Sequence, residues 1–525
     1  MAVVAGIDFG TLSVRVSLID SEAGRLAGAS AVYPVLRQAS DPAYAAQSAE
    51  DHLAALETAM RAALEAAGVA GDRVAALAVA TTGSTIVPVD RALRPLDNYY
   101  LWCDHRAEAE AAEITRVARE RGSPALQWYG GIYSSEMALA KLLHWLRHNP
   151  EKRARFSTAM EHCDWIVATL TGAAGIGDVT RSACAAGHKW LWRADDGGWP
   201  ADDFLHAVDP RLAGFAREAG SRIATSDRLA GRLCADWARR LGLREGLPIP
   251  VPALDAHWDA VGAGIAEGDV VNVVGTSTCV MAIVRETQPI AGVFGIVPGS
   301  IHPDYQGIEA GLSAAGDIFE SIARRAGTTV GALARRLERF EPGQTGLLRL
   351  VWDNGDRNVL SDTSLAGVTL GWRLHHTAQD ELFAAIEGTA FHTRIILERL
   401  AEHGVPINRI INGGGIPQKN EVLNQVYANI FNKPVLVPES EITSLGSAIF
   451  AFMAAGTFSS VREAQQNLCP RYRVVMPQPA AVARYAPWFR LYRRLYFAMG
   501  TREGGAPGSE SVLQELARLS AEGRV

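Results

Sequence analysis

Two stretches that lie about half a chain apart share one pattern and decide how the sequence is interpreted. The first reads AGIDFGTLSVRV (residues 5–16), and the second reads VVNVVGTSTCVM (residues 270–281). Each has an apolar β-rich run, a Gly-Thr turn with further hydroxyl residues, and a second apolar run. This pattern predicts strand, tight turn and strand in both places. A repeat at this separation favours two related domains.

The two turns carry groups that suit a phosphate. Their backbone N–H groups and hydroxyls are donors that can converge on an anion, and glycine lets the main chain approach it closely. The first turn offers Gly10, Thr11 and Ser13, and the second offers Gly275 and Thr276. Each turn alone could be an ordinary hairpin, whereas the pair favours one polyphosphate gripped from both domains. A Walker P-loop is excluded because the chain has no Gly-Lys dipeptide.

Charged residues lie next to these motifs. Asp8 ends the first strand and suits Mg²⁺, directly or through water, while Arg15 could neutralise a transferred group. Asp255, in the segment Ala-Leu-Asp-Ala-His-Trp-Asp at the junction of the two halves, is a candidate general base for a substrate hydroxyl. The alternative for Asp255 is a helix N-cap.

A third glycine motif, Gly413-Gly414-Gly415, follows a short predicted strand at 409–412 and precedes a predicted helix at 417–431. Glycines admit a flat base or a ribose against the backbone, and a helix N-terminus favours phosphate. The alternative is a simple tight turn. Periodic apolar residues predict further helices over 48–67, 313–325, 379–403, 443–455 and about 480–499.

Composition narrows the class of protein. The chain has 525 residues, 48% hydrophobic and 21% charged, which is typical of a soluble globular protein of two to four domains. A net charge of −6 argues against a broad nucleic-acid surface. The absence of an apolar run of about 18 residues argues against a membrane span. Six scattered cysteines argue against a disulfide scaffold or zinc site and suit the cytoplasm. The oligomeric state stays open, with a homodimer among the options.

With these motifs in place, the sequence resembles the FGGY carbohydrate kinases from about residue 3 to about residue 500. Its ribulokinase-like details are Cys279 and the stretches 133–136, 187–192, 307–317 and 352–358. The resemblance implies an α/β, two-domain, actin-like and ribonuclease H-like ATPase fold with a central interdomain cleft. It places the sugar-side domain at 1–254 and the nucleotide-side domain at 255–500. The remaining stretch, 501–525, contains Gly, Ser and Glu, and we expect it to be a mobile tail.

The resemblance also implies an activity: ATP-dependent phosphorylation of L-ribulose at its O5 hydroxyl, a step of L-arabinose catabolism, with ATP and Mg²⁺ as cofactors. Asp255 takes the position of the general base, and Asp8 and Asp255 lie near Mg²⁺. The implied sugar contacts are Thr82, Gly83, Lys189, Asp255 and Glu309. The implied ATP contacts are Gly10, Thr11, Ser13, Arg15, Gly275, Thr276, Gly414, Gly415, Gln418 and Asn420.

The residues themselves agree with a sugar ligand. A neutral sugar needs carboxylates, amides and an ammonium as paired hydrogen-bonding groups, and Lys189 is one of only five lysines among 51 basic residues. Around Lys141 the spacing departs from the general family pattern. Glu136 and Lys141 could support the site from a neighbouring helix, but we expect them to lie on a solvated helix face.

Three alternatives stay open. The first is a kinase of another pentulose or pentitol, such as D-ribulose, xylulose or ribitol. The second is a catalytically silent sugar-sensing homologue. The third is a chaperone-like or actin-like ATPase.

Overall fold

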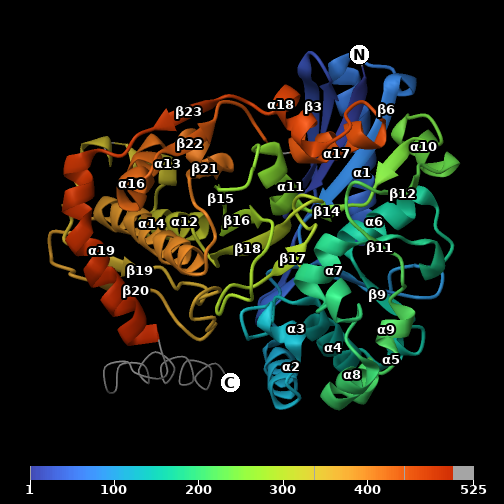
Figure 1. The fold of residues 1–525 in the computed structure, drawn as a ribbon, viewed down its shortest axis with the longest axis horizontal. Coiled ribbons are helices and arrows are strands. Elements are labelled where there is room, and N and C mark those ends of the chain that lie inside the picture. Colours follow the sequence, from blue (N-terminus) through green and yellow to red (C-terminus); the bar gives the residue numbers. More distant parts are fainter. Residues whose placement is uncertain (1, 336, 443, 501–525) are drawn as a thin grey trace. The chain divides into compact units, whose positions relative to one another are not determined.

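The computed structural model describes residues 2–335, 337–442 and 444–500, and Figure 1 shows its ribbon. The chain forms two compact units, each built from separate stretches of sequence. Unit 1 takes Met1–Gly264, Gly295–Gly307 and Ile442–Cys469, and unit 2 takes the remaining three stretches, 265–294, 308–441 and 470–525. The tail predicted at 501–525 lies outside the described residues, and the domain boundary predicted at 254/255 stays a prediction.

Unit 1 is organised by a five-stranded sheet in the order β14-β6-β1-β2-β3. β1 runs antiparallel to β2 and parallel to β6, and β6 runs parallel to β14. This pairing makes β14, β6 and β1 three neighbouring parallel strands. The bounds are β1 (Val3–Phe9), β2 (Ser13–Asp20), β3 (Gly24–Val32), β6 (Val74–Thr81) and β14 (Ala253–Leu254).

Helices α1 (Ala49–Ala67) and α17 (Leu445–Ala454) pack against this sheet. α1 begins where the sequence predicts, because Ser48 accepts a hydrogen bond from the Asp51 N–H at its first turn. It buries Leu56 and Met60 in the core of the unit. α17 approaches β1 so closely that a Cβ on Gly6 would lie 2.3 Å from the Ser444 carbonyl oxygen, so only glycine fits there.

The rest of unit 1 surrounds this centre. A second sheet has the order β4-β5-β8-β7-β9, with β4 (Leu36–Gln38), β5 (Asp41–Gln47), β7 (Ile86–Val89), β8 (Tyr99–Tyr100) and β9 (Thr158–Glu161). Shorter strands are β10 (Arg181–Ser182), β11 (Ile223–Ala224), β12 (Leu229–Arg232), β13 (Pro248–Pro250) and β17 (Ile296–Pro298). The helices are α2 (Glu108–Glu120), α3 (Pro124–Gln127), α4 (Ala138–His148), α5 (Pro150–Arg153), α6 (His162–Thr171), α7 (Ala183–Lys189), α8 (Asp202–Val208), α9 (Phe215–Glu218), α10 (Ala235–Leu241), α11 (Asp255–Gly262) and α18 (Val461–Leu468).

Unit 2 repeats the central arrangement of unit 1. Its strands follow the order β18-β16-β15-β21-β22-β23, in which β15 is antiparallel to β16 and parallel to β21, and β21 is parallel to β22. The bounds are β15 (Asp269–Val274), β16 (Thr278–Val284), β18 (Gln306–Leu312), β21 (Arg409–Gly413), β22 (Val435–Pro438) and β23 (Tyr472–Val475). The internal repeat predicted from the two Gly-Thr motifs is therefore confirmed as a structural repeat.

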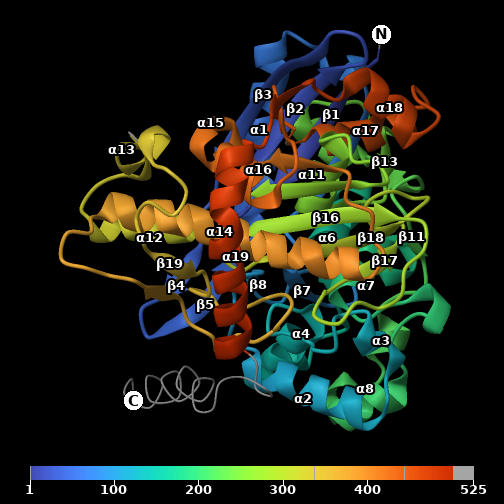
Figure 2. The ribbon, with the colours of Figure 1, turned by 60° about the vertical axis from the view of Figure 1, so that its left-hand side comes forward.

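Three helices dominate unit 2. α19 (Pro479–Gly500) contacts both α14 (Ala378–Glu402) and α16 (Glu421–Phe431), and Figure 2 shows it crossing in front of them. The predicted helix at 417–431 is two helices, α15 (Gly415–Lys419) and α16. They break at Asn420, whose side chain accepts from the Leu423 N–H and caps α16. The remaining elements are α12 (Gly316–Arg325), α13 (Val330–Ala334), β19 (Leu348–Leu350) and β20 (Val368–Leu370).

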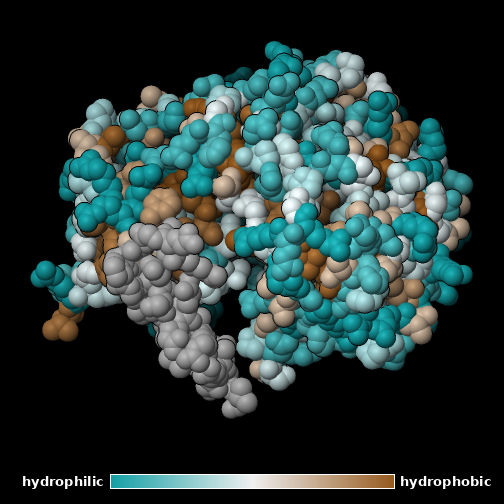
Figure 3. Space-filling model, turned by 60° about the horizontal axis from the view of Figure 1, so that its bottom comes forward, coloured by the Kyte–Doolittle hydropathy of each residue, from teal (hydrophilic) through white to brown (hydrophobic). Residues whose placement is uncertain are grey.

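Hydrophilic residues cover most of the face displayed in Figure 3, with hydrophobic residues in small groups between them. Among the helices of the described residues, none combines the length and the apolar character that crossing a bilayer requires.

Candidate active site

Three parallel strands of unit 1 end side by side and carry three of the predicted motifs. Thr81 at the end of β6 is the register partner of Phe9 in β1 and of Leu254 in β14. The residues that follow these strand ends are the Gly10 turn, the Thr82-Gly83 turn and Asp255. The carboxyl ends of parallel strands are where α/β proteins bind ligands, so the sheet itself assembles this group.

The first Gly-Thr turn has its carbonyl groups held from within the protein. The Tyr33 hydroxyl donates to the Gly10 carbonyl oxygen at 2.6 Å, and the Gln47 side-chain amide donates to the Thr11 carbonyl oxygen at 2.7 Å. The Trp102 indole N–H donates to the Thr11 hydroxyl oxygen at 3.1 Å. That hydroxyl keeps its own proton for an outside acceptor. The turn thus directs acceptors inward and leaves donors for an anion.

Two carboxylates and one guanidinium lie beside this turn. Asp8 is buried, and its Oδ2 lies 3.5 Å from Arg15 Nη1, whose side chain is half exposed. Burial, and then the negative charges of Asp8 and Asp255, raise the pKa of Tyr33. Asp8 lies one residue before the end of β1, and Asp255 follows the end of β14, so both carboxylates belong to the same edge of the sheet as the turn. Two oxygen-donor side chains at a partly open position fit a hard divalent cation such as Mg²⁺.

Asp255 is held at the start of a helix. It is the first residue of α11, one position after the N-cap residue Leu254, and its Oδ1 accepts from the Ala256 N–H at 2.7 Å. The N-cap role that the sequence left open thus falls to Leu254, and Asp255 stands at the next position. Gly83 packs against Leu254, since a Cβ on Gly83 would lie 2.4 Å from Leu254 Cδ2.

A buried glutamate links the Thr82-Gly83 turn to the segment of Lys189. Glu161 at the end of β9 accepts from the Thr85 N–H at 2.7 Å through Oε1 and from the Trp190 indole N–H at 2.8 Å through Oε2. Lys189 is buried at the end of α7, and the Tyr133 hydroxyl donates to its carbonyl oxygen at 2.6 Å. One carboxylate therefore sets the spacing between two predicted sugar contacts.

Lys141 supports the same turn from the other side. Its ammonium donates to the carbonyl oxygens of Ser84 at 2.9 Å and of Leu101 at 2.5 Å. The side chain is completely buried, and burial lowers the pKa of Lys141 to about 8. The prediction of a solvated position for Lys141 is therefore wrong. Its place on α4 looked exposed in the sequence because lysine is rarely buried without such partners.

In unit 2 the second Gly-Thr turn is fixed by a helix start. The Gly275 carbonyl oxygen accepts from the Gly316 N–H at 3.0 Å, and the Thr276 carbonyl oxygen accepts from the N–H groups of Ala315 and Asp317. The first N–H groups of α12 thus take up the carbonyls of the turn. The Gly275 N–H donates within the turn, to the Ser277 carbonyl oxygen at 2.9 Å, as the Gly10 N–H does to the Ser13 carbonyl oxygen at 3.0 Å in unit 1.

The glycine loop after β21 lies beside that turn, because Val273 of β15 is the parallel partner of Gly413. Gly414 has φ +91°, and a Cβ there would lie 2.5 Å from the Val274 carbonyl oxygen. A Cβ on Gly415 would meet no atom within 4 Å. Gly414 is therefore required by the fold, whereas Gly415 borders open space.

A row of buried asparagines supports the glycine loop from beneath. Asn272 Nδ2 donates to Asn412 Oδ1, and Asn412 Nδ2 donates to Asn424 Oδ1, each at 3.1 Å. Asn424 Nδ2 donates to the carbonyl oxygens of Pro417 and Asn420. These amides tie β15 and β21 to the start of α16.

Three other predicted residues have structural partners in unit 2. Gln418 Nε2 donates to the Ser440 carbonyl oxygen at 3.2 Å, and Asn420 caps α16. Glu309, a predicted sugar contact, is buried in β18. Asn358 accepts from the Gly311 N–H at 2.7 Å and thereby supports the end of that strand.

Sequence reasoning missed the groups that hold these motifs: Tyr33, Gln47, Trp102, Glu161, Trp190 and the three asparagines. Glu161 carried one usable signal, because it is an isolated charge within the otherwise uncharged stretch 157–163. The others are ordinary polar residues whose partners lie far along the chain, and no local pattern marks them.

Comparison with known proteins agrees with this arrangement. The model of the FGGY family of carbohydrate kinases, N-terminal domain, matches residues 3–262, and the C-terminal domain model matches residues 270–455. The chain is 34% identical to proteins named ribulokinase from Geobacillus thermodenitrificans and Anoxybacillus flavithermus, over 99% of this chain and 98% of each relative.

Solved structures with the same fold include a xylulose kinase from Rhodospirillum rubrum and a gluconate kinase from Lactobacillus acidophilus. The first has a TM-score of 0.79 and 21% identity over 94% of this chain and 98% of that one. The second has a TM-score of 0.80 and 20% identity over 96% and 99%. At these identities the likeness shows the fold alone, which is the actin-like ATPase class expected from the sequence.

The buried Glu161 gives a prediction about stability and pH. Burial raises its pKa from 4.5 to about 7, so the folded chain holds a proton here that the unfolded chain has lost between those pH values. Stability from this group is therefore fully present below pH 4.5 and falls as pH rises through 7. Relative to Glu161→Gln, which does not titrate, the wild type should lose up to about 3 kcal/mol across that window.

Urea unfolding of both proteins from about pH 4 to pH 8 measures this difference. The exposed variant Glu151→Gln is the control and should keep the pH dependence of the wild type. Parallel curves for the wild type and Glu161→Gln would contradict the prediction.

Proposed function

This chain belongs to the FGGY family of carbohydrate kinases, and we propose that the sugar it phosphorylates is L-ribulose, at the O5 hydroxyl. Membership makes the protein an ATP-dependent sugar phosphotransferase. The observation that carries the choice of sugar is the identity of 34%, over nearly the whole length, to relatives named ribulokinase. L-ribulose 5-phosphate would then be the product, as in L-arabinose catabolism.

The proposed sugar contacts suit a neutral polyol. Thr82, Gly83, Lys189 and Asp255 belong to unit 1, and Glu309 belongs to unit 2. Carboxylates accept hydrogen bonds from hydroxyls, and an ammonium donates to them or to a carbonyl oxygen. Lys189 and Glu309 are both buried, so hydrogen bonds from them to a sugar would be made away from bulk water.

We propose that Asp255 is the general base. Its carboxylate would accept the proton of the sugar hydroxyl as the oxygen attacks the γ-phosphorus of ATP in line. The P–O bond to ADP breaks as the new bond forms, and positioning and charge neutralisation supply most of the rate. The α11 start fixes the backbone of Asp255, and its Oδ2 is the oxygen that the Ala256 N–H does not use.

We propose that the triphosphate is bound by donors from both Gly-Thr turns, with Arg15 neutralising the transferred group. Gly414, Gly415, Gln418 and Asn420 would contact the adenosine. The open space at Gly415 supports this assignment, because a glycine that no fold contact requires is explained by a ligand against its backbone.

Further proposals concern the metal ion, the domain that binds each ligand, the cellular location and the oligomeric state. Mg²⁺ would be held by Asp8 and Asp255, directly or through water, and when bound it supplies charge neutralisation on the phosphates. We assign the sugar mainly to residues 1–254 and the nucleotide mainly to residues 255–500. A cytoplasmic location and a homodimer complete the proposal.

A panel of acceptors tests the choice of sugar. We expect ADP release with L-ribulose to have the highest kcat/KM among L-ribulose, D-ribulose, L-xylulose, D-xylulose and ribitol. Sugar-independent ATP turnover should be far slower, because water lacks the contacts that position the hydroxyl. A higher value for another acceptor would replace L-ribulose, and equal turnover without sugar would favour an ATPase. No ADP release with any acceptor would favour a sugar-sensing homologue.

Asp255→Asn tests the base. An amide cannot take the proton, so kcat should fall by roughly 10²–10⁴-fold, while L-ribulose binding measured by calorimetry should be largely kept. Asp259→Asn is the matched control, since it changes a second half-buried carboxylate on the same helix α11. Near-normal turnover by Asp255→Asn would refute the assignment.

Gly415→Ala tests the nucleotide site. A methyl group there fits the free protein, so the thermal midpoint should hold while the KM for ATP rises several-fold and the KM for L-ribulose stays constant. Gly414→Ala is the contrasting variant, and it should lower the midpoint because its Cβ collides with the Val274 carbonyl oxygen. An unchanged KM for ATP in Gly415→Ala would place the nucleotide elsewhere.

A further inference from the structure

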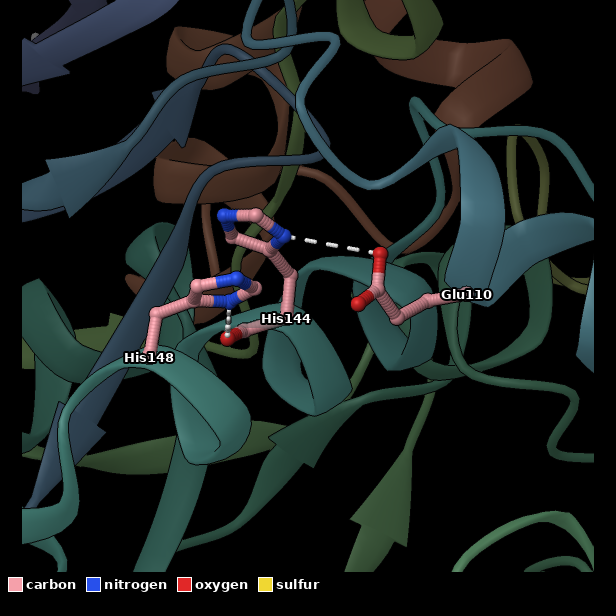
Figure 4. A group of neighbouring side chains, drawn as sticks. All are labelled: Glu110, His144 and His148. Atoms are coloured by element: carbon pink, nitrogen blue, oxygen red, sulfur yellow. Dashed lines mark hydrogen bonds and ion pairs between the residues drawn. The ribbon is translucent and has the colours of Figure 1, made fainter.

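One cluster of side chains in unit 1 takes no part in the proposed reaction. Glu110 lies on α2, and His144 and His148 lie one turn apart on α4. Figure 4 shows the carboxylate of Glu110 pointing at the His144 imidazole, with the His148 ring alongside. The two rings stack with centroids 4.0 Å apart. One ligand atom from each residue lies within 4.8 Å of the other two.

The carboxylate in this cluster is buried but only loosely paired. Glu110 Oε2 lies 3.4 Å from His144 Nδ1, and Oε1 lies 3.4 Å from Arg147 Nη1. Both distances exceed those of a good hydrogen bond. Arg147 is held more tightly by Asp209, at 2.8 Å through Nη2 and 3.0 Å through Nε. Glu110 is therefore a buried carboxylate whose contacts to His144 and Arg147 lie at the long end of the hydrogen-bond range.

His148 is prepared as a metal ligand. Its Nδ1–H donates to the His144 carbonyl oxygen at 2.8 Å, which leaves the lone pair on Nε2. Histidines that bind metals commonly donate their other ring N–H to a backbone carbonyl in this way, because the contact fixes the tautomer. The His148 side chain is exposed, so an ion can enter from solvent.

We propose that Glu110, His144 and His148 form a binding site for a divalent transition-metal ion of the zinc class. The donor set of two imidazole nitrogens and one carboxylate oxygen matches the preference of Zn²⁺, with water as the fourth ligand. Histidines four residues apart on a helix share one face, and this is the only such pair in the sequence.

Binding requires small movements only. Ligand atoms around a tetrahedral Zn²⁺ are about 3.3–3.5 Å apart, as follows from metal–ligand distances near 2.0–2.1 Å. Because the three ligand atoms lie within 4.8 Å of one another, each pair must close by at most about 1.4 Å. The exposed His148 ring can supply most of that movement. When the Glu110 side chain turns toward the ion, Arg147 still has its hydrogen bonds to Asp209. The bound ion would cross-link α2 to α4, the helix that also carries Lys141.

Calorimetric titration of the metal-stripped full chain with ZnCl₂ tests the site. We expect one Zn²⁺ bound by the wild type that His148→Ala binds at least tenfold more weakly, and a Zn²⁺-dependent rise of the thermal midpoint that this variant loses. Because His148 is exposed, the variant should fold. Glu110→Gln should weaken Zn²⁺ as well, and Co²⁺ should give visible d–d bands that both variants lose.

His403→Ala is the matched control. His403 makes the same Nδ1 contact to the carbonyl four residues earlier, Arg399, at 2.9 Å, and it too is exposed on a helix end. The His403→Ala variant should bind Zn²⁺ as the wild type does. In zinc-free buffer that contains Mg²⁺, His148→Ala should keep the wild-type turnover. Equal affinity in the wild type and His148→Ala, or an equal loss in His403→Ala, would overturn the proposal.

Discussion

The arrangement of unit 1 depends on the parallel pairing of β6 with β1 on one side and β14 on the other. Thr81 is level with both Phe9 and Leu254, so three chain segments leave the sheet at one height. A slip of one residue would reverse the faces of the side chains. It would also separate Asp255 from Asp8. The positions of the candidate site residues therefore depend on the register of β1, β6 and β14, which the site residues themselves do not determine.

The fold buries polar side chains such as Glu161 and Lys141. Hydrogen bonds to other buried groups stabilise these side chains in place of water. Glu161 and Lys141 each satisfy two backbone or indole partners. A buried charge is tolerable only when such partners replace water. The same contacts restrict the movement of the Thr82-Gly83 turn and of Lys189. Rigidity around a ligand site is useful, because a preorganised pocket loses less entropy on binding.

Local features of the fold could be predicted from the sequence, whereas side-chain support could not. The strands around both Gly-Thr turns follow from apolar runs bounded by turn residues, and the start of α1 follows from Ser48. The break at Asn420 was missed because the apolar residues that predict the helix lie at 423–430 and do not define where it begins. Lys141 was misplaced because burial depends on Ser84 and Leu101, which are distant in sequence. Glu161 was missed for the same reason, since its partners Thr85 and Trp190 lie on other elements.

For the proposed binding of phosphate, the two Gly-Thr turns meet the same electrostatic requirement with different supporting groups. A turn that is to hold an anion must keep its carbonyl oxygens away from it, because they repel negative charge. In unit 1 a tyrosine hydroxyl and a glutamine amide draw those carbonyls inward. In unit 2 the first N–H groups of α12 do so. The two turns share one sequence pattern, but different groups bond their carbonyl oxygens. What the two halves have in common is therefore the orientation of the backbone carbonyls and not the identity of the neighbouring residues. The repeated motif in the sequence is therefore short, and the residues that make it work differ between the two halves.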